Sequence, residues 1–241
     1  MAGFLARPED VGNGELVLRD GEAHHLARVR RLGVGDRAEA TDGRGRLFIV
    51  EVIAIDEERI VCRILEARVD AAEPPVRLCL APALIKGSRF DLVVEKATEL
   101  GVDAIAPLLT ERGVVRPTPE KVERWERVAR AAAKQSGRSR LPAIASPAPL
   151  AAVLTRIGDG QGLMAVPGQR AAGLRQVLAG RAARALLLLV GPEGGFTPDE
   201  EGLAAAAGVE RFSWGWTTLR AETACLVLAA LVLHEAAEAR P

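Results

Sequence analysis

Tyrosine is absent from this 241-residue chain, and aromatic residues make up only 3% of it. Proteins that read single-stranded RNA commonly stack bases on aromatic rings, and this chain offers few rings for that purpose. The charges balance as well, at 32 basic and 32 acidic residues, so no overall basic excess indicates a nucleic-acid partner. Balanced totals still permit local patches, and RNA recognition would then depend on shape and on phosphate contacts.

Cysteine and histidine are also scarce. The three cysteines, Cys62, Cys79 and Cys225, have neither the spacing of a metal site nor the density of a disulfide scaffold. We therefore expect buried thiols in a reducing compartment. The three histidines stand at positions 24, 25 and 234, a spacing that does not suit a metal site, and we expect no bound metal.

Long apolar segments are missing. The longest apolar run of the last expected helix, residues 224–233, spans ten residues, which is too short to cross a bilayer. The first ten residues include acids and no long apolar region, unlike a signal peptide. We expect no membrane segment and a cytoplasmic location.

Two parts of the chain differ in pattern. Residues 15–68 hold short strand-like runs separated by turn signals at 33–36 and 42–45, which predicts a small β-barrel. Within it, only residues 22–31 look helical. The sequence Glu73-Pro74-Pro75 indicates a linker, so we predict domains of residues 1–72 and 73–241.

From residue 76 onward, strand-like and helix-like segments alternate. This alternation predicts an α/β domain, with a parallel sheet and helices on both faces. The expected strands are residues 76–84, 104–110, 162–166, 185–190 and 211–214. The expected helices are residues 91–100 (closed by Gly101), 118–136 (with Pro119 in its first turn), 197–207 and 221–239.

A glycine-rich turn, Gly191-Pro192-Glu193-Gly194-Gly195, follows the expected strand at 185–190. Glycines let a ligand approach the backbone, and ligands of open α/β sheets bind at the carboxyl ends of strands. Neither GK[ST] nor GxGxxG is present, so no pyrophosphate site is indicated. Glu193 would repel a phosphate, whereas a ligand with a positive centre, such as S-adenosylmethionine, fits better. A plain strand–turn–helix corner explains the turn equally well.

A second glycine-containing strand end occurs in residues 213–226, SWGWTTLRAETACL. Arg220 and Glu222 lie at the start of the expected helix, where backbone donors and positive potential are concentrated. A glutamate there is an ordinary helix stabiliser. An arginine opposes the helix dipole, so Arg220 should have a partner outside the helix.

Together, LVGPEGGFTPDE (189–200) and LRAETACLVLAAL (219–231) resemble the C-terminal motifs of SPOUT methyltransferases. The resemblance is greatest to the family that methylates N3 of a uridine in bacterial 16S ribosomal RNA. Residues 24–36, 95–112 and 131–142 match the same family, so the resemblance covers nearly the whole chain. It implies an N-terminal PUA-like β-barrel, a C-terminal α/β domain with a deep trefoil knot, a homodimer, and S-adenosylmethionine held in the knotted loops.

The resemblance also implies site residues. The cofactor-binding candidates are Ala165, Val166, Val190, Gly191, Pro192, Glu193, Gly194, Gly195, Trp214, Gly215 and Leu219. The catalytic candidates are Arg220, which would stabilise charge on the uracil, and Glu222, which would act as a base or orient Arg220. The family usually has a proline or arginine and a β-branched residue before LR. This chain has Trp216 and Thr217 in that loop, so a contact by a basic side chain there is lost.

Residues 111–140 carry nine Lys/Arg against four Glu, a local positive excess. The basic residues 124, 127, 130 and 134 recur on one helix face, and the glutamates can pair with the earlier ones. The end beyond residue 127 is the better phosphate site, although an ordinary exposed helix also explains the pattern. The RNA-contact candidates are His25, Arg28, Arg30, Arg31, Lys134, Gln135, Arg138 and Arg140, with Gln135 and Arg138 suited to a flipped nucleotide. The expected partner is 16S rRNA in a preassembled small ribosomal subunit.

Other functions stay open at this point. A ribose 2′-O-methyltransferase of the same fold would differ in its product nucleoside. A non-catalytic RNA-binding assembly factor would fail to bind S-adenosylmethionine, and the intact GPEGG and LRAET stretches argue against it. A nucleotide hydrolase is disfavoured, because the chain has no phosphate-loop lysine.

Overall fold

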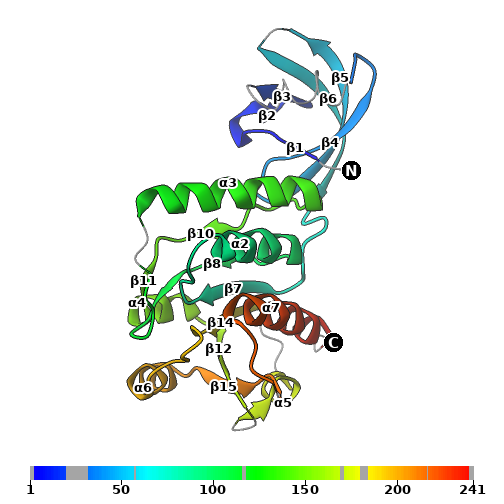
Figure 1. Cartoon of the computed structure of the whole chain (residues 1–241). Helices are drawn as coiled ribbons and strands as arrows, with labels where there is room; N and C mark the ends of the chain where they lie inside the picture. The colour runs from blue at the N-terminus through cyan, green and yellow to red at the C-terminus, as the bar shows by residue number, and fades with distance from the viewer. Residues whose placement is uncertain are drawn as a thin grey trace. The chain divides into compact units, whose positions relative to one another are not determined.

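The computed structural model describes residues 3–19, 32–56, 58–115, 118–168, 171–179, 184–215 and 217–238. They form two compact units (Figure 1). Unit 1 is Met1–Glu73 with Arg130–Leu141, and unit 2 is Pro74–Ala129 with Pro142–Pro241. Unit 1 thus takes in a segment from the middle of the chain that a single boundary at residue 72 does not assign to it.

Unit 1 is built on one six-stranded sheet. Its strands are β1 (Phe4–Leu5), β2 (Val11–Gly12), β3 (Glu15–Arg19), β4 (Arg37–Thr41), β5 (Arg46–Ile55) and β6 (Arg59–Val69), with a 3₁₀ turn, η1, at Pro8–Asp10. The order is β1-β4-β5-β6-β3-β2, antiparallel except where β1 pairs with β4. Register shifts between β5 and β6, after Ile49 and after Val52, increase the bend of the sheet, and Figure 1 shows both strands curved.

The core of unit 1 follows from alternation along its strands. In β5, Phe48, Val50 and Val52 are buried, and the residues between them are less so. They pack with Leu16, Leu18, Ile60 and Cys62 on one face of the sheet. The predicted short strands are confirmed, whereas the helix predicted at residues 22–31 lies outside the described residues.

Unit 2 contains a seven-stranded sheet in which all neighbouring strands are parallel. Its strands are β7 (Arg77–Pro82), β8 (Ala104–Ile105), β10 (Ala143–Ile144), β12 (Gln161–Val166), β13 (Ala172–Gly173), β14 (Ala185–Val190) and β15 (Glu210–Ser213). The order is β10-β8-β7-β14-β12-β15-β13, and β9 (Leu108–Leu109) pairs separately with β11 (Ala148–Pro149). Strands β14, β12 and β15 are therefore neighbours, and their carboxyl ends meet at one edge.

Helices cover both faces of this sheet. The helices of unit 2 are α2 (Arg89–Leu100), α4 (Leu150–Leu154), α5 (Leu174–Leu178), α6 (Pro198–Ala206) and α7 (Ala221–Glu238), with a 3₁₀ turn, η3, at Thr155–Ile157. Helix α3 (Pro119–Ser136) begins in unit 2, and its residues from Arg130 on belong to unit 1. Along β14, Leu186 and Leu188 join the core formed with α2 and α7, while Leu187 and Leu189 join the core formed with α4 and α6. Each fully buried leucine contributes about 2 kcal/mol of transfer free energy. Figure 1 shows α2 and α7 beside β7.

The helix ends agree with the sequence signals. Helix α2 closes at Gly101, which has a left-handed φ of 99°, and α3 begins at Pro119. The predicted parallel sheet with helices on both faces is confirmed. Among the helices that the structure describes, none has the length and apolar character needed to cross a bilayer.

Candidate active site

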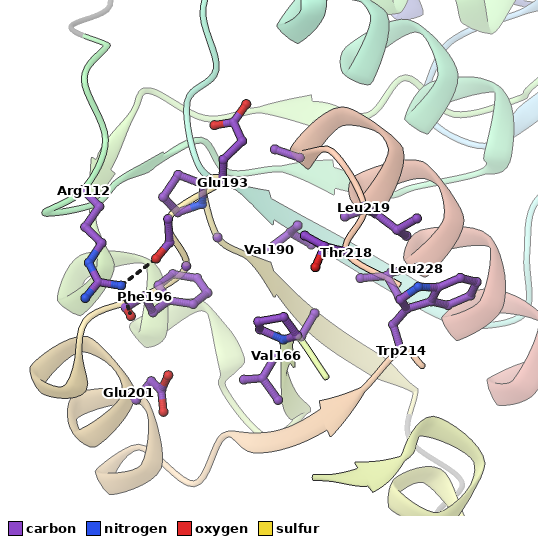
Figure 2. Close-up of a pocket in the computed structure, with 18 of the residues that line it drawn as sticks. Arg112, Val166, Val190, Glu193, Phe196, Glu201, Trp214, Thr218, Leu219 and Leu228 are labelled. Atoms are coloured by element: carbon purple, nitrogen blue, oxygen red, sulfur yellow. Dashed lines mark hydrogen bonds between the residues drawn. The ribbon is translucent and has the colours of Figure 1, made fainter. Parts of the chain in front are cut away.

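A pocket of about 270 Å³ lies at the carboxyl ends of β14, β12 and β15. Strand β12 ends in Ala165 and Val166, and Val190 ends β14. Trp214 follows β15, and the start of α7 completes the wall. Figure 2 shows Val166 and Val190 between Arg112 on one side and Trp214 and Leu219 on the other. In open α/β sheets, this edge is where ligands bind.

The pocket brings together ten of the eleven predicted cofactor-binding residues. They are Ala165, Val166, Val190, Gly191, Pro192, Glu193, Gly194, Gly195, Trp214 and Leu219. Gly215 follows Trp214 directly but is not part of the wall. The sequence did not predict that Arg112, Phe196, Glu201, Thr218 and Leu228 also line it.

The glycine turn is tightly built. The Gly195 N–H donates to the Pro192 carbonyl at 2.8 Å, and Gly195 has a φ of +69°, which favours glycine. A Cβ on Gly191 would lie 3.1 Å from Cε2 of Phe196, which is buried. A side chain at position 191 is thus disfavoured by close packing.

Arg112, which lies outside the glycine turn, hydrogen-bonds to its backbone. Its Nη1 donates to the carbonyls of Gly194, at 2.5 Å, and Phe196, at 3.2 Å (Figure 2). Hydrogen bonds from a charged donor are stronger than neutral ones. The sequence placed Arg112 in the family-like stretch 95–112 and in the basic segment 111–140. It did not indicate its hydrogen-bond partners, which lie more than 80 positions away.

A capping box at the start of α6 links the turn to the same segment. The Thr197 hydroxyl accepts from the Glu200 N–H at 3.3 Å, and Glu200 Oε2 accepts from the Thr197 N–H at 2.9 Å. Glu200 is buried, and its Oε1 accepts from the N–H of Glu111 at 2.9 Å. One carboxylate therefore caps α6 and holds the residue that precedes Arg112.

The predicted catalytic residues begin α7. Arg220 is exposed, and neither Arg220 nor Glu222 lines the pocket, although their neighbours Leu219 and Ala221 do. Glu222 is 9% exposed, and its Oε2 lies 3.6 Å from Nη1 of Arg89. The same Arg89 atom lies 3.5 Å from Oε1 of Glu193.

The predicted RNA contacts fall into three groups. Lys134 is half-buried and Gln135 is exposed at the end of α3, while Arg140 is hydrogen-bonded to Asp70. Arg138 is only 3% exposed and its guanidinium binds Glu73, which argues against a phosphate contact by this side chain. The remaining candidates, His25, Arg28, Arg30 and Arg31, lie outside the described residues, as does Trp216.

The cysteine thiols are not suited to nucleophilic chemistry. Burial raises the pKa of Cys62 and of Cys79 to about 11, and that of Cys225 to about 12. All three are free thiols. In the part of the chain that the structure describes, no three His, Cys, Asp or Glu side chains gather as a metal site would require.

Comparison with known proteins gives the class of the molecule. A family model described as an RNA methyltransferase domain matches residues 72–233, and one described as an RNA methyltransferase PUA domain matches residues 18–65. The fold and the pocket thus belong to an RNA methyltransferase of the SPOUT type. Ribosomal RNA small subunit methyltransferase E of Synechocystis is 35% identical over 95% of this chain and 76% of its own length. The chain belongs to the ribosomal RNA small subunit methyltransferase E family.

Solved structures agree with this assignment. A ribosomal RNA small subunit methyltransferase E from Neisseria gonorrhoeae, bound to S-adenosyl methionine, has a TM-score of 0.85 and 29% identity, covering 97% of each chain. A methyltransferase from Legionella pneumophila in complex with the same cofactor has a TM-score of 0.81 and 26% identity, again over 97% of each chain. The predicted family and the predicted α/β fold with an N-terminal PUA-like domain are confirmed.

Proposed function

We propose that this protein transfers the methyl group of S-adenosylmethionine to N3 of a uridine in 16S ribosomal RNA of the small subunit. The observation that carries the proposal is the pocket at the ends of β14, β12 and β15, in a chain of the methyltransferase E family. The N. gonorrhoeae relative, with a TM-score of 0.85, was solved with the same cofactor.

The pocket wall fits this cofactor chemically. Val166, Val190 and Leu228 give it apolar surface for a purine, and the glycine turn leaves backbone groups accessible. The carboxylate of Glu201, which also lines the pocket, is an acceptor for hydroxyl and ammonium groups. S-adenosylmethionine carries no phosphate, so a carboxylate in the wall does not repel it.

The chemistry requires alignment, a proton acceptor and exclusion of water. When bound, S-adenosylmethionine would supply an electrophilic methyl group on a sulfonium, whose sulfur would keep the C–S electron pair and leave as a neutral thioether. Glu222 accepts the N3 proton, so that the N–H electron pair becomes the new bond to the methyl carbon. Arg220, whose side chain has no ion-pair partner among the described residues, stabilises negative charge on the uracil oxygens. The apolar wall excludes water from the reacting atoms.

RNA contacts are proposed on unit 1. Lys134, Gln135 and Arg140 lie in the segment Arg130–Leu141, and the sequence in this region carries a positive excess. His25, Arg28, Arg30 and Arg31, which lie outside the described residues, are proposed as RNA contacts from the sequence alone. We assign RNA binding to residues 1–72 together with the segment Arg130–Leu141, and methyl transfer to the rest of residues 73–241. We further propose that the protein acts as a homodimer in the cytoplasm, where ribosomal subunits are found, and light scattering measures the oligomeric state.

Nucleoside mass spectrometry tests the reaction. Small ribosomal subunits from a strain that does not make the protein are incubated with it and S-adenosylmethionine, and the RNA is digested. We expect N3-methyluridine with the wild type, and formation of the same nucleoside about 10²-fold more slowly with the Glu222→Gln variant. A 2′-O-methyl nucleoside instead would contradict the base specificity. Failure to bind S-adenosylmethionine would contradict the methyltransferase assignment and favour an RNA-binding assembly factor.

A further inference from the structure

Arg89 joins two carboxylates that come from distant parts of unit 2. It is the first residue of α2, and its Nη1 lies 3.5 Å from Glu193 in the glycine turn and 3.6 Å from Glu222 in the first turn of α7. A cation at the first position of a helix is disfavoured by the helix dipole. The two carboxylates therefore account for the position of this guanidinium, and helix α2 does not.

Glu222 is only partly satisfied by this pairing. Its side chain is 12% exposed, and its Oε2 is buried and accepts no hydrogen bond from the residues that the structure describes. At 3.6 Å the contact with Arg89 is an ion pair without hydrogen-bond geometry. Buried carboxylate oxygens normally accept hydrogen bonds, because their desolvation is otherwise uncompensated. An acceptor of this kind suits a donor that arrives with the substrate.

Glu193 is placed to transmit the position of Arg89 to the pocket. Glu193 forms part of the pocket wall, and its side chain is 57% exposed. In Figure 2 its carboxylate points away from Val166, out of the pocket, which agrees with its pairing to Arg89. Arg89 thus stabilises the glycine turn on one side through Glu193, while Arg112 donates hydrogen bonds to the turn carbonyls on the other.

We infer that Arg89 is a positioning residue that orients Glu222 toward the N3–H of the bound uridine and fixes the glycine turn through Glu193. This inference rests on the proposed function. According to this inference, Arg89 touches neither the reacting atoms nor the methyl group. It acts through two carboxylates, and its effects should disappear when those carboxylates are removed.

A double-mutant cycle tests this. The single-turnover rate on small ribosomal subunits is measured at saturating S-adenosylmethionine for the wild type, Arg89→Ala, Glu222→Gln and the double variant. We expect the Glu222→Gln rate to fall by about 10²-fold or more, as for loss of a general base, and the Arg89→Ala rate by roughly tenfold. Since Arg89 acts through Glu222, the double variant should be no slower than Glu222→Gln alone.

Calorimetry gives a second readout that does not depend on turnover. We expect Arg89→Ala to raise the Kd for S-adenosylmethionine by roughly threefold to tenfold through Glu193, and to add nothing in a Glu193→Gln background. Arg89→Lys, which keeps the charge, should recover part of both effects and serves if the alanine variant does not fold. Arg175→Ala is the matched control, because Arg175 also pairs with a glutamate of α7, Glu235, at 3.0 Å, away from the pocket wall. The Arg175→Ala variant should change neither the single-turnover rate nor the Kd for S-adenosylmethionine.

Several outcomes would overturn the inference. Unchanged rates and Kd for Arg89→Ala would do so directly. Fully multiplicative losses in the double variants would indicate that Arg89 contacts RNA itself and does not work through the carboxylates. If the wild type produced no N3-methyluridine, the proposed function would fail, and the calorimetric cycle with Glu193 would still decide the role of Arg89 in the turn.

Discussion

Arg138 and Glu73 form an ion pair that is buried on both sides. Their closest atoms, Nη2 and Oε2, are 2.7 Å apart, and the side chains are only 3% and 6% exposed. Glu73 Oε1 also accepts from the backbone N–H groups of Ser139 and Arg140, each at 2.9 Å. Both carboxylate oxygens are thus satisfied, which is the condition under which a buried pair is tolerated. The pair ties the segment after α3 to the end of the β6 region within unit 1.

Removing either partner of this pair should make the folded protein less stable. We expect Glu73→Ala and Arg138→Ala each to lower the free energy of unfolding by about 3–5 kcal/mol, because each leaves a buried charge without its partner. Urea unfolding followed by circular dichroism measures this. Glu66→Gln, in the exposed pair with Arg68, is the control and should leave the midpoint unchanged. A fully stable Arg138→Ala variant with weakened RNA binding would instead support the phosphate contact suggested by the sequence.

The second prediction concerns Arg112. Arg112→Ala should weaken S-adenosylmethionine binding about tenfold, since two hydrogen bonds from a charged donor to the turn carbonyls are lost at a partly exposed site. Isothermal titration calorimetry measures the Kd. Lys96→Ala, on the exposed side of α2, removes a cation that pairs with Glu95 and Glu99 and should leave the Kd unchanged. An unaltered Kd in Arg112→Ala would show that the turn holds its shape without it.

The third prediction concerns Gly191. In Gly191→Ala the new methyl group would lie 3.1 Å from the ring of Phe196, so the ring or the turn must move. We expect roughly tenfold weaker cofactor binding and a loss of about 1 kcal/mol in the free energy of unfolding. Gly202→Ala is the opposite case, because a Cβ there meets open space on α6 and alanine is the better helix former. That variant should be more stable by about 0.5–1 kcal/mol, with binding intact. If Gly191→Ala and Gly202→Ala changed stability and cofactor binding equally, the packing of Gly191 against Phe196 would not be what excludes a side chain there.

Elements with strong local signals could be predicted from the sequence. Strand β14 is uniformly apolar because both of its faces are buried, and the T-P-D-E start of α6 carries its own capping box. The glycine turn of the pocket wall also follows from local chemistry, since such a turn after a buried parallel strand lies at the carboxyl edge of the sheet. The other predicted wall residues came from the family resemblance. The short elements were missed. Helices α4 and α5 have five residues each, too few for a helical period to stand out.

Long-range pairs could not be predicted. Arg89 follows Gly87 and Ser88 in what looks like an exposed turn, and its partners Glu193 and Glu222 lie more than 100 positions away. Arg138 stands in the polar run QSGRSR, which by composition is a surface segment, yet it is buried against Glu73. In both cases the local sequence shows the arginine but does not show which distant carboxylate folding will place beside it. A trefoil knot, likewise, is a property of how the chain is threaded and leaves no periodic trace.

The last prediction concerns alkaline pH. Burial raises the pKa of Cys62 and Cys79 to about 11 and that of Cys225 to about 12, from an ordinary value of 9.0. The unfolded chain therefore loses its thiol protons first as the pH rises. Stability from the neutral thiols is complete below pH 9 and is lost between pH 9 and 12, by up to about 1.4 kcal/mol per pH unit for each thiol.

Urea unfolding at pH 8, 9, 10 and 10.5 measures this loss, and the absence of tyrosine leaves no phenol to titrate in the same range. Cys225→Ala should be less stable at pH 8, because it leaves a cavity, but its stability should fall less steeply above pH 9. Iodoacetamide at pH 8 should label the native thiols far more slowly than the unfolded ones. A decline of the same slope in the variant and the wild type would show that Cys225 does not contribute to it, and that lysine deprotonation accounts for the alkaline loss.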